Sequence, residues 1–327
     1  MHHKWCTRSP RRVSGAQERS WPLQILRVAR SARKASSWVS FSHIACGTFV
    51  PMGSHSPIIV RAMEHSSEEM AALEERRMAL SISEVALESE AIAGGWMCYS
   101  RPGCWSNQAN AMGLDGPVTE DELNRLVKFY RERNAKPRVS ACPSAHHSLV
   151  KGLESRHFEL CEILTVLARD LAEPLAPMTS PWSPPDQMLE IRQPLPEEEG
   201  VFIEISTSGF MEHDSESPGA LAEITRRVVD HPRCTPFLAL WDGIPVGGGL
   251  LETLGDQACL IGTSVLPEFR GRGIQTHLMA HRMEFASKTG AKWITVSSLT
   301  GIATERNARR LGFNPIFAHA TFIQNAG

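Results

Sequence analysis

A strand-to-helix corner rich in glycine and arginine is the strongest constraint on how this chain can fold. Residues 264–279 read SVLPEFRGRGIQTHLM, with Arg-Gly-Arg-Gly at 270–273. Pro267 ends the apolar strand before the corner, because proline cannot donate to a sheet ladder. A helical pattern begins at Ile274. Glycines allow backbone amides to approach a ligand, and the first amides of a helix lack partners at the positive end of its dipole. The corner therefore suits phosphate binding.

Two common phosphate motifs are absent from this corner. A P-loop needs G-x-x-x-x-G-K-[ST], which the corner lacks. A dinucleotide fingerprint needs G-x-G-x-x-G, but Thr276 stands at its last position and hairpins rather than a single strand precede it. The pattern that fits is Arg-x-x-Gly-x-(Gly/Ala), written here as Arg270, Gly273 and Gln275. An ordinary glycine turn with solvated arginines is the alternative.

The elements around the corner predict a mixed α/β sheet. Residues 188–195 predict a strand and residues 219–231 a helix. Three strands with turns at Asp242–Gly243 and Gly255–Asp256 follow. A helix from Ile274 to about Lys288, a strand at 293–299, a helix at 303–311 and a last strand at 316–323 complete the order. Antiparallel hairpins that lead into strand–helix–strand units are typical of a mixed sheet.

The first half has a similar alternation of elements. Residues 66–93 predict a helix with an apolar stripe. Thr119 and Glu122 form a capping-box pattern at the start of a second helix, and a third is expected at about 144–155. Five prolines between Pro174 and Pro185 indicate an extended linker. We therefore expect domains at 56–173 and 187–327, joined by a linker at 174–186.

Charge is spread unevenly along the chain. Residues 1–50 hold nine Lys/Arg and one acid, Glu18, whereas the remainder is acidic. A transit peptide, a disordered basic tail and a wrongly assigned start upstream of Met52 or Met63 are the three interpretations of residues 1–55, of which the last two are preferred. The acidic remainder argues against a nucleic-acid partner. No apolar run reaches the ~20 residues that span a bilayer.

The eight cysteines show no C-x-x-C pair and no zinc-type spacing. We expect no metal site and a cytoplasmic protein with scattered free thiols.

The corner, its neighbouring elements and the terminal RNARRLGF together resemble the GCN5-related N-acetyltransferases, the GNAT superfamily. The resemblance covers roughly residues 188–324. It implies an α/β GNAT fold that binds acetyl-CoA and transfers the acetyl group directly to an amine. Carried over by position, it implies that the corner amides and the Thr276 hydroxyl hold the diphosphate and that the end of the strand pairs with the pantetheine arm. The implied cofactor-binding residues are Val265, Leu266, Arg270, Gly271, Arg272, Gly273, Ile274, Gln275 and Thr276.

Residues 60–172 resemble a second, degenerate copy of the family fold. Their corner has no Arg-x-x-Gly-x-(Gly/Ala), and Gly116-Pro117 stands in its place. Because Pro117 removes an amide donor, we expect this half to be a non-catalytic packing partner.

Two positions depart from the family pattern. Gln275 replaces the last Gly/Ala, and Ala308 stands where many members have the tyrosine that protonates the leaving thiolate. The general base is expected to be a carboxylate, or a water held by one, near the diverging strands. Glu252 and Asp256 flank the right hairpin, and a solvated turn residue is the alternative interpretation of both. Glu252 is the candidate, whereas the solvated interpretation is slightly preferred for Asp256. Cys259 is expected to be a buried, inert thiol.

The sequence is consistent with two main hypotheses about function and with a third, weaker one. The first is an acetyl-CoA-dependent N-acetyltransferase acting on a small-molecule or peptide amine. The second is an acyl-CoA-binding or regulatory protein that has lost catalysis, and the third is a nucleotide-binding oxidoreductase. A homodimer is left open.

Overall fold

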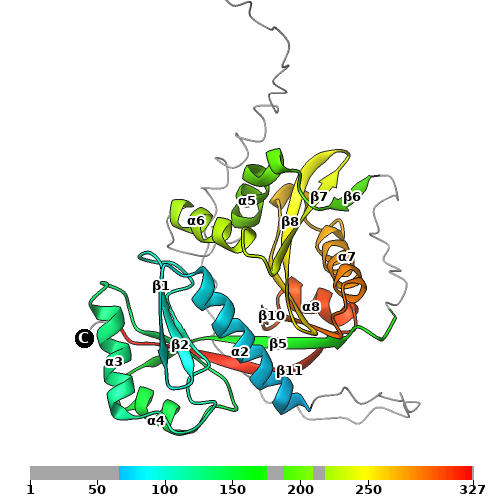
Figure 1. Ribbon diagram of the computed structural model, residues 1–327. Helices are drawn as coiled ribbons and strands as arrows, with labels where there is room; N and C mark the ends of the chain where they lie inside the picture. Colours follow the sequence, from blue (N-terminus) through cyan, green and yellow to red (C-terminus); the bar gives the residue numbers. More distant parts are fainter. Residues whose placement is uncertain (1–65, 175–187, 209–217, 326–327) are drawn as a thin grey trace, which may run out of the picture. The chain divides into compact units, whose positions relative to one another are not determined.

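The computed structural model describes residues 66–174, 188–208 and 218–325, and these form one mixed sheet (Figure 1). Its order is β1-β2-β3-β4-β11-β5-β10-β9-β8-β7-β6. The pairs β3–β4 and β9–β10 are parallel, and the other pairs are antiparallel. The strands are β1 (Glu88–Ile92), β2 (Gly95–Tyr99), β3 (Ala109–Asn110), β4 (Arg138–Ala141), β5 (Glu159–Asp170), β6 (Leu189–Arg192), β7 (Cys234–Trp241), β8 (Ile244–Leu254), β9 (Gln257–Val265), β10 (Trp293–Leu299) and β11 (Asn314–Ile323).

Helices pack on both faces of this sheet. Neighbouring side chains on one strand show the two layers: Leu250 packs with α5 and α6, whereas Leu251 packs with α7 and α8. Glu74 of α2 reaches Thr295 of β10, while Ile294 joins the α7 layer, so α2 lies on the opposite face from α7. The helices are α2 (Ser67–Val85), α3 (Glu120–Arg131), α4 (Ser148–Glu154), α5 (Glu199–Ser208), α6 (Pro218–Val229), α7 (Ile274–Lys288) and α8 (Ala303–Arg310), with 3-10 turns η1 (Pro196–Glu198) and η2 (Pro267–Phe269).

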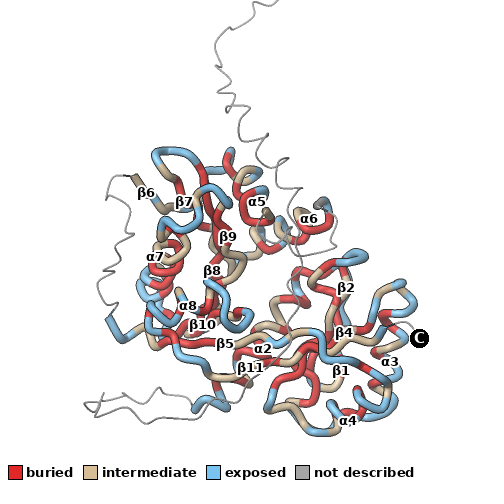
Figure 2. Tube along the Cα trace, turned by 180° about the vertical axis from the view of Figure 1, so that it is seen from behind, coloured by how far each residue is buried: buried red, intermediate tan, exposed pale blue. Residues whose placement is uncertain are grey.

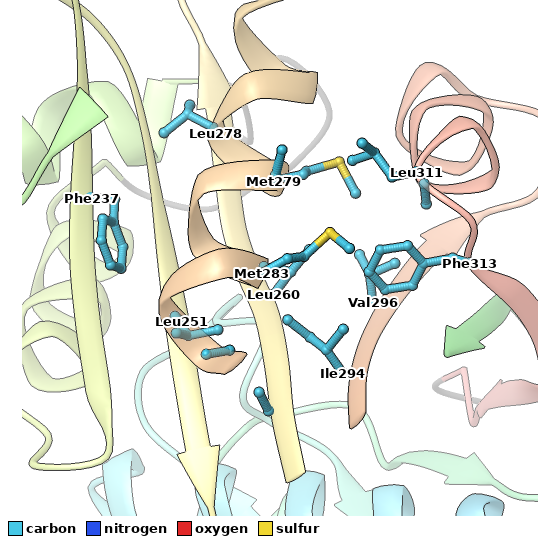
Figure 3. Packing of buried hydrophobic residues seen from close by; sticks show 14 of the residues in the cluster. Phe237, Leu251, Leu260, Leu278, Met279, Met283, Ile294, Val296, Leu311 and Phe313 are labelled. Atoms are coloured by element: carbon cyan, nitrogen blue, oxygen red, sulfur yellow. The ribbon is translucent and has the colours of Figure 1, made fainter. Parts of the chain in front are cut away.

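The main core of the second half lies between the sheet and α7. Met279 and Met283 of α7 face Ile294 and Val296 of β10, with Phe313 closing the side next to α8 (Figure 3). Figure 2 shows buried residues concentrated along β8 and β9. This packing fixes α7, and with it the corner that precedes α7, against the strands of the second half.

The two halves exchange strands. β5 of the first half pairs with β10 from Trp293↔Asp170 to Leu299↔Leu164, and it pairs with β11 on its other edge. β11, the last strand, also pairs with β4 from Ala320↔Ala141 to Ile323↔Arg138. Each half therefore needs a strand of the other to complete the ladder.

Most predicted elements are confirmed, including the mixed α/β fold, the 274–288 helix and the turns at Asp242–Gly243 and Gly255–Asp256. The Thr119–Glu122 capping box also forms. The single helix predicted for residues 66–93 is wrong, because α2 ends at Val85 and β1 follows it. Helix α5 was not predicted: its sequence, EGVFIEISTS, has little helical periodicity.

The predicted domain boundaries stay predictions. The leader at 1–55 and nearly all of the linker predicted at 174–186 lie outside the described residues.

Candidate functional site

The predicted corner joins β9 to α7 as the sequence indicated. After η2, the chain turns through Gly271 and Gly273, both with φ +77°, a conformation that other residues adopt at a cost. Gly273 is the N-cap of α7 and offers no side-chain cap. The backbone amides of residues 271–276 make no hydrogen bond to another group of the described residues. The corner therefore presents a run of free donors at the positive end of α7.

The two arginines of the corner have different surroundings. Arg270 Nε donates to the carbonyl of Val265 at 3.1 Å, which ties the loop back to the end of β9. The Arg272 guanidinium lies 5.2 Å from the ring centre of Trp241 and 5.1 Å from that of Phe269. Aromatic faces hold a cation without neutralising it. Arg272, which is exposed, thus adds positive charge beside the amides.

Gln275, the departure from the Gly/Ala pattern, is directed toward α8. Its Nε2 donates to Thr304 Oγ1 at 3.0 Å, and its Oε1 accepts from Asn307 Nδ2 at 2.7 Å. The long side chain thereby joins the first turn of α7 to α8. Thr276, next to it, is partly exposed on the first turn, and Ile274 is buried in the core.

The strands beside the corner diverge. β9 and β10 pair in parallel from Trp293↔Gln257 to Val296↔Leu260 and no further. β9 continues to Val265, while β10 continues to Leu299 paired with β5 instead. Residues 261–265 of β9 therefore pair with no strand of the described residues on the side toward β10, and we call this side their free edge. Leu266, just after this segment, is held by a hydrogen bond from its amide to the Val246 carbonyl at 2.9 Å.

Comparisons with known proteins agree with this geometry. A sequence profile described as the acetyltransferase (GNAT) family matches residues 200–313. Residues 200–313 form a GNAT domain. This segment contains the corner, the diverging strands, α7 and α8. None of the curated proteins matches the sequence significantly.

Two solved structures resemble this chain over more than residues 200–313. A GCN5-related N-acetyltransferase from Kribbella flavida superposes with a TM-score of 0.60 at 15% identity, covering 81% of this chain and 98% of its own. A conserved protein of unknown function from Staphylococcus epidermidis superposes with a TM-score of 0.50 at 10% identity, covering 67% and 84%. At these identities the likeness shows the fold. The first of these matches extends over both halves, beyond the GNAT domain itself.

Glu252, the predicted general base, is buried on β8 with both carboxylate oxygens engaged. Oε2 accepts from Arg77 of α2, and Oε1 accepts from Ser81 of α2 and from Arg233 Nε at 3.3 Å. Its exposure is 1%. Because both oxygens are already engaged by neighbouring side chains, these contacts favour a structural role. The assignment of Glu252 as the base stays a prediction.

Neither tyrosine of the chain supplies the missing acid of the GNAT domain. Ala308, at the family's tyrosine position, is fully buried in the core. Tyr130 is buried in the first half, where its hydroxyl donates to the Cys98 carbonyl at 3.2 Å, and burial holds its pKa well above the usual value. Tyr99 also belongs to the first half, on β2.

Cys259 is an inert thiol, as expected from the sequence. It lies buried on β9, and burial raises the pKa of its thiol to about 12. Nucleophilic cysteines instead need a thiolate near neutral pH.

The corresponding corner of the first half is already filled by the chain itself. The Glu122 carboxylate accepts from the backbone amide and the hydroxyl of Thr119, both at 2.8 Å. The Thr119 hydroxyl accepts in turn from the Glu122 amide at 3.3 Å. A carboxylate therefore occupies the positive end of α3, where a phosphate would otherwise bind.

Two groups near the site were missed at the sequence level. α2, from the first half, covers the closed end of the diverging strands with Glu74 and Arg77. Arg282 of α7 is fully buried beneath β9. The only sequence signal for Arg282 is a charge on the apolar side of a helix, which by itself does not identify a partner.

No helix of the described residues is long and apolar enough to cross a membrane. No group of three or more His, Cys, Asp or Glu in the same residues is arranged to hold a metal ion.

Proposed function

We propose that this protein is an acetyl-CoA-dependent N-acetyltransferase that transfers an acetyl group directly to an amine in a ternary complex. The free amides of residues 271–276, next to the open edge of β9, carry the proposal. A diphosphate needs several converging donors and positive potential, and the capless start of α7 offers both. The GNAT domain at 200–313 supports the same reaction class.

The residues present fit acetyl-CoA. The corner is rich in donors, Arg272 adds charge, and Gln275 is directed toward α8. The free edge of residues 261–265 offers backbone groups to the amide-containing arm of the cofactor. Acetyl-CoA would supply the activated thioester. The residues that would hold it are Val265, Leu266, Arg270, Gly271, Arg272, Gly273, Ile274, Gln275 and Thr276.

The protein's own residues bind and orient more than they exchange protons. The acceptor amine has to be neutral to attack, so a proton must leave it. Because Glu252 is engaged by Arg77 and Arg233, we propose that water takes this proton. Water would also protonate the leaving thiolate, since Ala308 offers no hydroxyl. The proposed acceptor is a small-molecule or peptide amine.

A second candidate function is acyl-CoA binding without catalysis. The observation that favours it is the combination of Ala308 in the acid position with an engaged Glu252. Both candidates require the corner to bind CoA, and only the first requires turnover.

Acetyl-CoA consumption against a panel of amines separates the two. Chromatography of the coenzyme is the appropriate readout, because exposed cysteine thiols such as Cys161 react with thiol dyes. Isothermal titration with CoA measures whether the protein binds the coenzyme. Turnover with at least one amine supports the transferase; tight CoA binding without turnover supports the binding protein; and no CoA binding contradicts both.

A further inference from the structure

Arg282 places a positive charge inside the protein, and no carboxylate of the described residues pairs with it. Its side chain is fully buried on α7. The guanidinium donates to three backbone carbonyls, of Leu278 at 3.0 Å, Leu250 at 2.7 Å and Ile261 at 3.3 Å. It also donates to the Thr263 hydroxyl at 2.6 Å. Burial lowers the pKa of this arginine to about 9. Burying such a charged group costs free energy, so its presence in the core calls for a structural or functional explanation.

The acceptors of Arg282 surround a break in the β8–β9 ladder. The register runs Gly248↔Ser264 and then Leu250↔Ile261, so Gly249 on one strand and residues 262–263 on the other are left out of it. Gly262 has φ +59°. Arg282 bonds to Ile261 at one end of the break and to Thr263 within it, which supplies contacts that the ladder loses there.

Gly249, opposite Arg282, makes room for the guanidinium. A Cβ at Gly249 would stand 2.7 Å from Nη1 and 2.8 Å from Cζ. No side chain other than hydrogen fits that position while the guanidinium remains in place. Gly249 and Arg282 are therefore one structural unit formed by two elements.

The break coincides with the end of the β9–β10 pairing. Leu260 is the last residue of β9 that pairs with β10. Ile261 and Thr263, which bond to Arg282, follow it along the strand. The contacts of Arg282 with Ile261 and Thr263 therefore help to set the direction in which residues 261–265 run. This segment is the one that offers backbone groups to the cofactor arm in the proposed function.

We propose that Arg282 is a positioning residue for acyl-CoA: together with Gly249 it fixes the break in β8–β9 and so orients the free edge of β9 toward the thioester arm. This inference rests on the proposed function. It gives the buried arginine of α7 a task that goes beyond filling space between the helix and the sheet.

The test compares two single variants with their double. Arg282→Met removes the guanidinium, and Gly249→Ala displaces it from the opposite strand without altering α7. Each should raise KM for acetyl-CoA about tenfold with a smaller change in kcat, as expected when ground-state positioning is lost. Because both act on one unit, the double variant should be no worse than either single variant. Arg226→Met and Gly200→Ala, at exposed positions, are the matched controls.

A readout without cofactor keeps this proposal separable from the proposed function. Hydrogen exchange of the apo protein should accelerate in residues 257–266 in both variants and stay unchanged in the controls. Unchanged exchange there overturns the role of Arg282, whatever the activity. Faster exchange with an unaltered KM overturns its link to the cofactor. If the wild type itself does not bind CoA, the proposed function fails. If Arg282→Met does not fold, Gly249→Ala still tests the role of Arg282. The conservative Arg282→Lys provides a second test, because its KM for acetyl-CoA should rise less than that of Gly249→Ala.

Discussion

Arg77 of α2 and Glu252 of β8, 175 positions apart in the sequence, form a buried ion pair. Arg77 also holds Glu74 through two hydrogen bonds, at 2.9 Å and 2.6 Å. Burial acts to lower the pKa of Arg77, but Cys259, Glu74 and Glu252 together hold it well above its usual value. The first half therefore attaches to the GNAT domain through charges that neither half could bury alone.

Arg77→Ala should be strongly destabilising. Removing the guanidinium leaves Glu74 buried without its cation and leaves Glu252 with Arg233 as its remaining cation. Breaking a buried pair in this way costs about 3–5 kcal/mol. Urea unfolding monitored by circular dichroism measures the loss. Arg76→Ala is the matched control: Arg76 pairs with Asp115 on the surface, where such a pair is worth at most about 1 kcal/mol. Equal effects of the two variants would contradict the structural role given to Arg77.

Gly273→Asp should weaken CoA binding. It places a Cβ and an anion at the cap of α7, where the diphosphate would lie, and the expected loss is about tenfold or more, from about 1–3 kcal/mol of charged hydrogen bonds. Isothermal titration with CoA measures it. The control is Gly255→Asp in the β8–β9 turn, which has the same positive-φ backbone and no atom near its added Cβ. Unchanged affinity in a folded Gly273→Asp protein would refute the assigned corner.

The corner was predictable because its determinants are local. Pro267, the two glycines and the start of α7 act within a few residues of one another, and the structure reproduces the predicted turn and helix bounds. The free amides of residues 271–276 follow from the same short segment.

The contacts that surround the corner could not be predicted, because they join distant segments. Glu252 looked like a carboxylate beside diverging strands; its partner Arg77 lies on a helix of the other half. Arg282 looked like one more charge on a helix, and only the break in β8–β9 shows what it holds. The strand exchange is likewise invisible to periodicity, since β5 and β11 would look the same in any pairing.

Glu198 should contribute to stability above its unfolded pKa and lose that contribution in acid. Hydrogen bonds from the Arg192 guanidinium hold the pKa of Glu198 below its usual value of 4.5, and the Leu195 amide adds to this. A carboxylate with a lowered folded-state pKa stabilises the fold at higher pH, and the effect disappears as pH falls through that pKa. Urea midpoints from pH 7 to about 3 should therefore show a gap between wild type and Glu198→Gln that closes below about pH 4.5.

Glu197→Gln, at the exposed neighbouring position, is the control for the loss of one negative charge from this turn. A gap between wild type and Glu198→Gln that stays constant over the whole range would mean that the Glu198 carboxylate does not titrate as its contacts with Arg192 require.

The exchange of β5 and β11 predicts that the halves fold only together. Fragments 59–180 and 181–327, expressed separately, should aggregate, because each exposes a sheet edge that the other half normally covers. Co-expressed, they should copurify as a one-to-one complex that binds CoA as the full chain does. Affinity purification through a tag on one fragment, followed by light scattering and titration, measures this. A chain cut only in the linker by an inserted protease site is the control and should stay associated. A soluble, monomeric 181–327 fragment with full CoA affinity would show that the exchanged strands are dispensable to the GNAT domain.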